Sequence, residues 1–214
     1  MVTLLRADDP AAVAQAVRLL REGAIVAVPT DTVYGLAVDP LFPGAVERIF
    51  ALKERPSSVP LPVLVAGAEQ VASVAGHLEP AAQGLADRFW PGPLTLVVPR
   101  TRGFDVDLGG GPSGRWTVGV RWPDHPVMRA LCAEVGPLAV TSANAHGKPP
   151  ATNADEVLGS FPAVEDTGVS VRAPDAVLDG GRCDRPPSTV VECRGPASRC
   201  LREGTIPWAE LAEG

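Results

Sequence analysis

Four polar stretches of the chain carry side chains that could bind a charged small molecule. Each lies at the end of an apolar segment: PTDTVYGL at residues 29–36, KER at 53–55, TVGVR at 117–121 and TSAN at 141–144. Loops at strand ends are where α/β sheets usually bind ligands. The alternative is that Thr, Ser and Asn only form turns and helix caps here, and for any single stretch this interpretation is equally good.

The use of lysine favours a phosphate ligand. Of the 19 Lys and Arg residues, only Lys53 and Lys148 are lysines, and both lie in polar loops. A composition that avoids lysine is expected to keep it where a compact ammonium matters, for example against phosphate oxygens.

Other common chemical motifs are absent or misplaced. GGGPSG at residues 109–114 satisfies a GxGxxG pattern, but a strand is predicted after it where a dinucleotide site needs a helix, so it is interpreted as a loop. The sequence has no GxxxxGK[ST], no GxSxG, and no cysteine or histidine at metal-ligand spacing, so no metal site is predicted. Asp31 is the one candidate general base, although a carboxylate in such a turn is more often a backbone cap.

Hydrophobic periodicity and turn signals indicate the elements that must position these residues. Helices are predicted from Asp8 or Asp9 to Gly23 and over 43–53, 68–75, 80–89 and 126–135. Strands are predicted over 24–28, 61–66, 94–98, 116–121 and 138–141, and later at AVLDGG, STVVEC and SRCLREG. Strands alternate with helices early and cluster late, which predicts one α/β (α+β) domain over residues 1–214 with a mixed sheet.

Charge and hydropathy limit the classes of function. The formal net charge of −6 argues against a protein that holds nucleic acid by charge alone. No apolar run approaches the roughly 20 residues of a membrane span, and an acidic pair interrupts the N-terminus before a signal-type core forms. We therefore expect a cytoplasmic protein.

The ordered set of motifs resembles the YrdC family of threonylcarbamoyl-AMP synthases. PTDTVYGL, KxRP followed by PL, FWPGPLT, TVGVR, PLAVTSAN, STVV and LRxG follow the family order and spacing from about Gly23 to Ile206. The resemblance implies a single YrdC-like domain, a twisted mixed sheet flanked by helices with a concave ligand cleft. Because the chain stops at residue 214, we expect the short form without the additional C-terminal domain of the longer family branch.

The resemblance also implies an activity. In this family L-threonine, bicarbonate and ATP give threonylcarbamoyl-AMP and pyrophosphate, toward the threonylcarbamoyl modification of adenosine 37 in tRNA. We therefore expect a nucleotidyltransferase that uses ATP and Mg²⁺, with a separate tRNA threonylcarbamoyltransferase complex as its partner. Such a reaction demands charge and positioning rather than a protein nucleophile.

Site residues follow from the same resemblance. Lys53 and Arg55 would be catalytic and, with Arg202 and Mg²⁺, neutralise the triphosphate and the departing pyrophosphate. Further ATP contacts match Thr117, Ser142 and Asn144. Arg121 matches the residue whose planar fork binds the threonine carboxylate, and the other substrate positions match Thr30, Thr32, Tyr34, Thr141 and Ser188.

Three positions depart from the family pattern and bear on nucleotide affinity. Pro150 stands in place of a serine, His146 replaces a small residue, and Glu203 replaces the proline of LRPG and so places a carboxylate beside Arg202.

Two other functions stay open. One is a YrdC-like enzyme that makes a different carbamoyl-adenylate, and the other is an RNA-binding module. Arg121, Thr32 and Ser188 favour an amino-acid substrate, while the net charge of −6 leads us to expect weak or no direct nucleic-acid binding.

Overall fold

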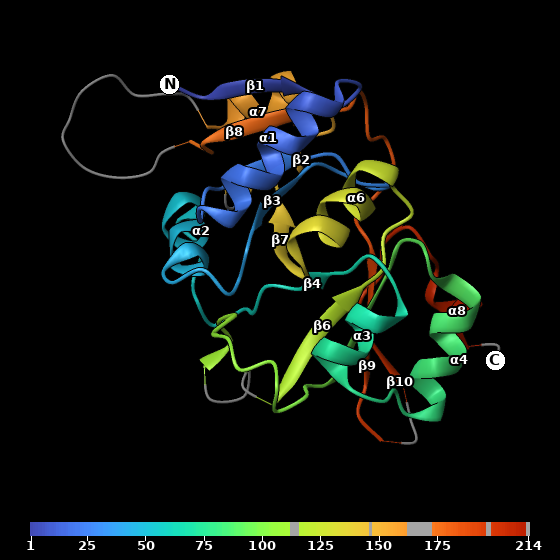
Figure 1. Cartoon of the computed structure of the whole chain (residues 1–214). Coiled ribbons are helices and arrows are strands. Elements are labelled where there is room, and N and C mark those ends of the chain that lie inside the picture. The colour runs from blue at the N-terminus through green and yellow to red at the C-terminus, as the bar shows by residue number, and fades with distance from the viewer. Residues whose placement is uncertain (112–115, 146, 162–172, 196–197, 213–214) are drawn as a thin grey trace.

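A mixed β-sheet forms the centre of the protein, whose computed structural model describes residues 1–111, 116–145, 147–161, 173–195 and 198–212. The sheet has ten strands in the order β1-β8-β2-β3-β7-β4-β6-β5-β9-β10 (Figure 1). Four neighbouring pairs are parallel, namely β1 with β8, β8 with β2, β4 with β6, and β5 with β9. The other pairs are antiparallel, so the sheet is mixed as the sequence predicts.

The strands and helices have the following bounds. The strands are β1 (Thr3–Arg6), β2 (Val26–Val28), β3 (Gly35–Val38), β4 (Val63–Leu64), β5 (Leu94–Pro99), β6 (Thr117–Arg121), β7 (Leu138–Ser142), β8 (Ala176–Asp179), β9 (Thr189–Cys193) and β10 (Ser198–Arg202). The helices are α1 (Pro10–Arg21), α2 (Ala45–Lys53), α3 (Ala68–Ala75), α4 (Pro80–Phe89), α6 (Pro126–Val135), α7 (Ala154–Ser160) and α8 (Trp208–Ala212).

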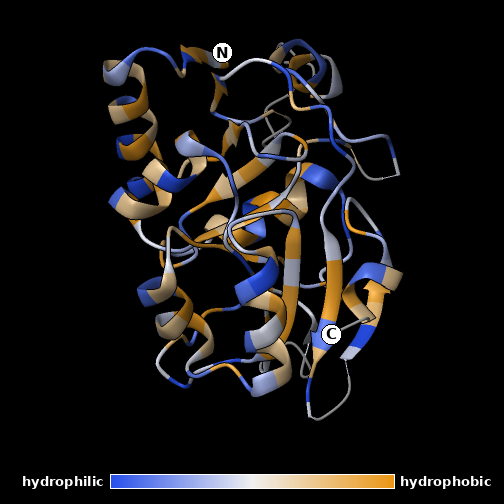
Figure 2. Cartoon of the chain, turned by 90° about the vertical axis from the view of Figure 1, so that its right-hand side faces the viewer, coloured by the Kyte–Doolittle hydropathy of each residue, from blue (hydrophilic) through white to orange (hydrophobic). Residues whose placement is uncertain are grey.

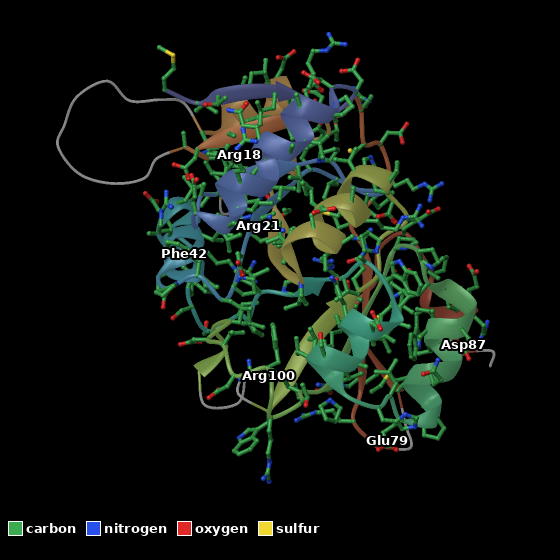
Figure 3. All side chains as sticks on the ribbon, in the orientation of Figure 1. Arg18, Arg21, Phe42, Glu79, Asp87 and Arg100 are labelled. Carbon is green, nitrogen blue, oxygen red and sulfur yellow. The ribbon has the colours of Figure 1, made fainter. Side chains whose placement is uncertain are left out.

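Helices cover both faces of the part of the sheet that contains β1, β8, β2 and β3. Val26 and Val28 of β2 pack in one cluster with the buried sides of α1 and α6, whereas Ala27 packs in the cluster that includes α2. This division follows from the alternation of side chains along a strand. Arg18 and Arg21 lie on the exposed side of α1 (Figure 3), and Arg21 Nη2 donates to the Glu134 carbonyl near the end of α6.

The part of the sheet formed by β6, β5 and β9 has, within the described residues, helices against one face only. The core on that face is formed with α3, α4 and α8. It contains Val118 and Val120 of β6, together with the alternate apolar residues of β5 and β9. Figure 2 shows these strands as largely hydrophobic and the helices as mixed, with hydrophilic turns outside. Residues of β6 at the intervening positions face the opposite side, where no helix of the described part of the chain packs. This uncovered face provides the site.

Most of the predicted elements are confirmed, and several end where the sequence indicated. The bounds of α3, α4 and α6 agree with the predicted ranges, whereas the strand expected over 61–66 is reduced to the two-residue β4. Four elements of the structure lack a predicted counterpart, namely β1, β3, α7 and α8. The expectations for His146 and for the end of the 109–114 loop fall outside the described residues.

Within the described residues, no helix is long and apolar enough to cross a membrane.

Candidate active site

A cavity of about 390 Å³ lies on the uncovered face of the sheet. Its wall is formed by β5, β6, β7, β9 and β10 together with the loops after β2 and α2. All the residues predicted for the site line it, except Lys53, Tyr34 and Asn144. Its size is within the range of small-molecule pockets.

Strand alternation explains why TVGVR contributes to the cavity. Thr117, Gly119 and Arg121 line it, while Val118 and Val120 point into the core on the other face. Gly119 adds no side chain, which leaves space between the threonine and the arginine. The motif therefore contributes alternate residues to the core and to the cavity lining.

The guanidinium of Arg121 is held from three sides. Its Nε donates to the Gly92 carbonyl at 3.1 Å, Nη1 to Thr32 Oγ1 at 3.1 Å and Nη2 to Asp31 Oδ1 at 2.5 Å. The ion pair is buried, with side-chain exposures of 6% for Arg121 and 5% for Asp31. Burial lowers the pKa of Arg121 and the Asp31 carboxylate opposes that effect, so the pair keeps a cation in a desolvated place.

The hydroxyls of PTDT build the turn that carries Asp31. Thr30 Oγ1 donates to the Val33 carbonyl at 2.6 Å and accepts from the Thr32 backbone N–H at 3.1 Å, and the two threonine hydroxyls lie 3.1 Å apart. Such bonds are typical of Ser/Thr turns. The turn-forming role expected for these residues is thus confirmed, and both threonines also line the cavity, so the same hydroxyls remain candidates for ligand contact.

Tyr34 supports this turn from behind and does not line the cavity. Its side chain is fully buried, and its hydroxyl donates to the Gly181 carbonyl at 2.7 Å and accepts from Gly180 N–H at 3.1 Å. Desolvation raises the pKa of this phenol well above its ordinary value. Tyr34 therefore reaches a ligand only through the loop that it anchors.

Ser188 connects two parts of the cavity wall, Thr95 of β5 and Arg202 of β10. The Ser188 and Thr95 hydroxyls share a hydrogen bond of 2.9 Å, and Arg202 Nη2 donates to the Ser188 carbonyl at 2.7 Å. Thr95 lines the cavity and was missed as a site residue, although it ends the FWPGPLT motif. The available signal was a polar residue at the start of an otherwise apolar strand. Thr95 lies on the same face of β5 as Val97, and both line the cavity.

Gly204 allows the backbone after Arg202 to pack closely against the backbone of Pro187 and Ser188. A Cβ at this position would lie 2.1 Å from the Pro187 carbonyl oxygen and 2.7 Å from two Ser188 backbone atoms. Its N–H donates to Thr189 Oγ1 at 3.0 Å. Only a residue without a side chain lets the chain after Arg202 pass so near to Ser188.

Replacing Gly204 with alanine should therefore destabilise the protein by about 1–3 kcal/mol, because backbone must move to admit the methyl group. Gly84→Ala is the matched control, since a Cβ there meets nothing within 4 Å in the exposed middle of α4. It should stabilise by roughly 0.5–1 kcal/mol. Urea unfolding of both variants checks this; equal stability of the two would contradict it.

Lys53 lies beneath the cavity wall and not in the cavity. Its side chain is 4% exposed, and Nζ donates to the Ser142 carbonyl, with Asn144 Oδ1 at 3.3 Å and Thr141 Oγ1 at 3.4 Å. Desolvation, with a smaller contribution from the positive charge of Arg55, lowers the pKa of Lys53 to about 7. Lys53 therefore holds the end of β7, and Asn144 is one of the groups that hold Lys53.

Arg55, Arg121 and Arg202 form a cluster of positive charge around the cavity. Burial is the main cause of the lowered pKa of each of them, and Arg202 further lowers the pKa of Arg55 and Arg121. Arg55 Nη1 donates to Thr141 Oγ1 at 3.0 Å. Asp31 is the one carboxylate paired with the cluster among the described ion pairs, so the cavity keeps a surplus of positive charge that suits an anion.

The two described departures from the family pattern lie outside the cavity lining. The Glu203 carboxylate accepts from the Trp208 N–H at 3.0 Å at the start of α8, and the described ion pairs do not join it to Arg202. Pro150 precedes Ala151, which pairs through its backbone with Ala143 and Tyr34. Neither position places a repulsive group against a ligand in the cavity.

The described residues contain no group of three or more His, Cys, Asp or Glu side chains that could hold a metal ion. All four cysteines are free, and Cys132, Cys183 and Cys193 are buried. The donors around the cavity are hydroxyls and guanidinium groups, a set that suits phosphate and carboxylate oxygens rather than a resident cation.

The fold and the cavity define an α/β protein with a cation-rich pocket for a small anionic ligand. A family model described as Sua5_yciO_yrdC, telomere recombination, matches residues 18–204. The chain belongs to this family, which confirms the resemblance seen in its motifs.

Individual relatives agree with this assignment. A threonylcarbamoyl-AMP synthase of Bacillus subtilis is 38% identical over an alignment of 210 positions that covers 94% of this chain and 56% of the relative. A putative threonylcarbamoyl-AMP synthase of Mycobacterium tuberculosis is 35% identical over 205 residues, 94% of this chain and 88% of the relative. The crystal structure of Pyrococcus abyssi Sua5 complexed with L-threonine matches with a TM-score of 0.86 at 35% identity, over 100% of this chain and 60% of that chain. This chain spans a little over half the length of the Bacillus and Pyrococcus relatives.

Proposed function

We propose that this protein is an L-threonylcarbamoyladenylate synthase, which makes threonylcarbamoyl-AMP and pyrophosphate from L-threonine, bicarbonate and ATP. The observation that carries the proposal is the placement of the buried Arg121 fork, with Thr32 beside it, in one cavity with Arg55 and Arg202. A carboxylate receptor and a polyphosphate receptor in one small pocket match the two charged substrates.

In the proposed reaction bicarbonate loses hydroxide to give CO₂, the threonine amine adds to the CO₂ carbon, and the proton that the amine loses converts the hydroxide to water, which leaves a carbamate. A carbamate oxygen then attacks the α-phosphorus of ATP, and the bond to the β,γ-phosphates breaks to release pyrophosphate. Arg121 binds the threonine carboxylate, with Thr32 and Ser188 beside it. Arg55 and Arg202 neutralise the charge that grows on the leaving pyrophosphate, and Thr117 and Ser142 hydrogen-bond the nucleotide.

Mg²⁺ enters this proposal as part of the MgATP substrate, because the described residues offer no carboxylate set for a resident ion. Lys53 acts by fixing the Thr141–Ser142 end of β7, through the hydrogen bonds of Nζ. Threonylcarbamoyl-AMP would pass to a separate transferase complex that modifies adenosine 37 of tRNA in the cytoplasm, where all these substrates occur.

The test is pyrophosphate release from ATP and bicarbonate, with and without L-threonine. Threonine should increase the rate about tenfold or more, and Arg55→Ala should lower it by about 100-fold, because it removes a donor aimed at developing negative charge. Arg48→Ala is the matched control, since Arg48 pairs with Asp175 away from the cavity and should leave the rate unchanged. Release that ignores threonine would replace this proposal with another carbamoyl-adenylate, and no release at all would reject both.

A further inference from the structure

We propose that Asp31 is a positioning residue: its carboxylate fixes the Arg121 guanidinium so that two N–H groups stay available for the carboxylate of an α-amino acid. This inference rests on the proposed function and adds to it a residue that acts through Arg121. The alternative role for Asp31, a general base, makes different predictions.

The donor count of Arg121 supports positioning. A guanidinium has five N–H groups, and three of them are used on Gly92, Thr32 and Asp31. One N–H therefore remains on each terminal nitrogen of a side chain that lines the cavity. Two N–H groups on adjacent nitrogens are the arrangement that binds a carboxylate with both of its oxygens.

The location of Asp31 argues against a base. It does not line the cavity, although the threonines on both sides of it do. Its Oδ1 is occupied by Arg121, and its Oδ2 is buried with no hydrogen-bond partner among the described residues. A base must come within hydrogen-bond reach of the proton it takes, and both oxygens face protein.

Electrostatics permits a second carboxylate at Arg121. Asp31 neutralises one positive charge, but Arg202 lies near enough to lower the pKa of Arg121, so a positive charge remains in range. The negative charge of Asp31 weakens attraction for the substrate, whereas its hydrogen bond removes the rotational freedom of a long side chain. We expect the second effect to be larger, because Asp31 and Arg121 are both buried and at 2.5 Å.

Two variants separate positioning from base catalysis. Asp31→Ala removes the acceptor and should raise the KM for L-threonine by about 30-fold or more, while kcat at saturating threonine and the KM for ATP change less than about threefold. Asp31→Asn keeps an oxygen in the same place and should limit the rise to about fivefold, since a neutral acceptor is weaker but still orients the fork. A base role predicts that both variants lose about 100-fold in kcat, because an amide cannot take the proton.

Asp175→Asn is the matched control, because it weakens a partly exposed aspartate–arginine pair away from the cavity. It should leave the KM for threonine unchanged. If Asp31→Ala does not fold, Asp31→Asn alone distinguishes positioning from base catalysis. In that variant, a KM for threonine within about 1.5-fold of wild type, or a large loss of kcat, overturns the inference. If wild-type protein shows no threonine-dependent pyrophosphate release, it is the proposed function that fails.

Discussion

Replacing Arg121 with leucine should lower the free energy of unfolding by about 3–5 kcal/mol, because the Asp31 carboxylate would remain buried without its counter-ion. Side-chain exposures of 6% and 5% leave little solvent to replace the guanidinium. If the proposed function holds, the same change should reduce threonine-dependent pyrophosphate release by about 100-fold or more, since the two charge-assisted hydrogen bonds proposed for the substrate carboxylate would be lost together. Urea unfolding followed by circular dichroism and a pyrophosphate assay measure the two effects.

Arg48→Leu provides the comparison for stability. Arg48 and Asp175 also form an ion pair at 2.9 Å, but their side chains are 36% and 39% exposed. Solvent can therefore replace much of that interaction, and the cost should be about 1 kcal/mol. The double variant Asp31→Asn with Arg121→Leu should recover part of the stability of Arg121→Leu without recovering activity. A loss of less than about 1 kcal/mol in Arg121→Leu would show that the buried pair is not as desolvated as its geometry indicates.

The sequence predicted helices best where local signals were strong. α4 and α6 both begin with a proline, and both carry a regular apolar face, so their bounds were correct. The unpredicted α7 and α8 have seven and five residues, too few for a periodic pattern to be visible. α7 does carry a local start signal, because the Asn153 side chain accepts from the Glu156 N–H. Both helices, however, also depend on packing of Ala154, Val157 and Leu211 in the core.

The unpredicted strands depend on long-range pairing. β3 is buried at all four positions, so it shows no alternation of polar and apolar residues. β1 has a single buried residue, and its partner β8 is far away in the sequence, with Leu4 opposite Val177. Neither strand has a periodic signal of its own.

The candidate site was predicted as a set of residues but not as a set of contacts. The motifs located the cavity wall because each lies where a strand or helix ends. They could not show that Lys53 turns inward toward Asn144, or that Asp31 reaches Arg121 across the sheet. Both facts depend on how segments about 90 residues apart are brought together, which sequence spacing does not encode.

Lys53 should make the protein more stable as the pH rises from 6.5 to 8.5, by roughly 2 kcal/mol. Its pKa is about 7 in the folded protein and 10.5 when it is exposed. Between these values the unfolded chain binds a proton that the folded protein has released, so the free energy of unfolding increases with pH. Below pH 7 the ammonium is charged in both states, and the full cost of burying it remains.

Lys53→Met isolates this contribution from the other groups that titrate nearby. Burial lowers the pKa of His125, which adds a small effect of the same sign near pH 6.5. Burial raises the pKa of Cys132, Cys183 and Cys193 from 9.0, which acts in the opposite direction as the pH approaches that value. Chemical unfolding at several pH values up to 8.5 should show a clear rise for wild type and a nearly flat dependence for Lys53→Met. Equal slopes would mean that Lys53 keeps its proton in the folded protein, and its ammonium would then stay charged under the Thr141–Ser142 end of β7 throughout this pH range.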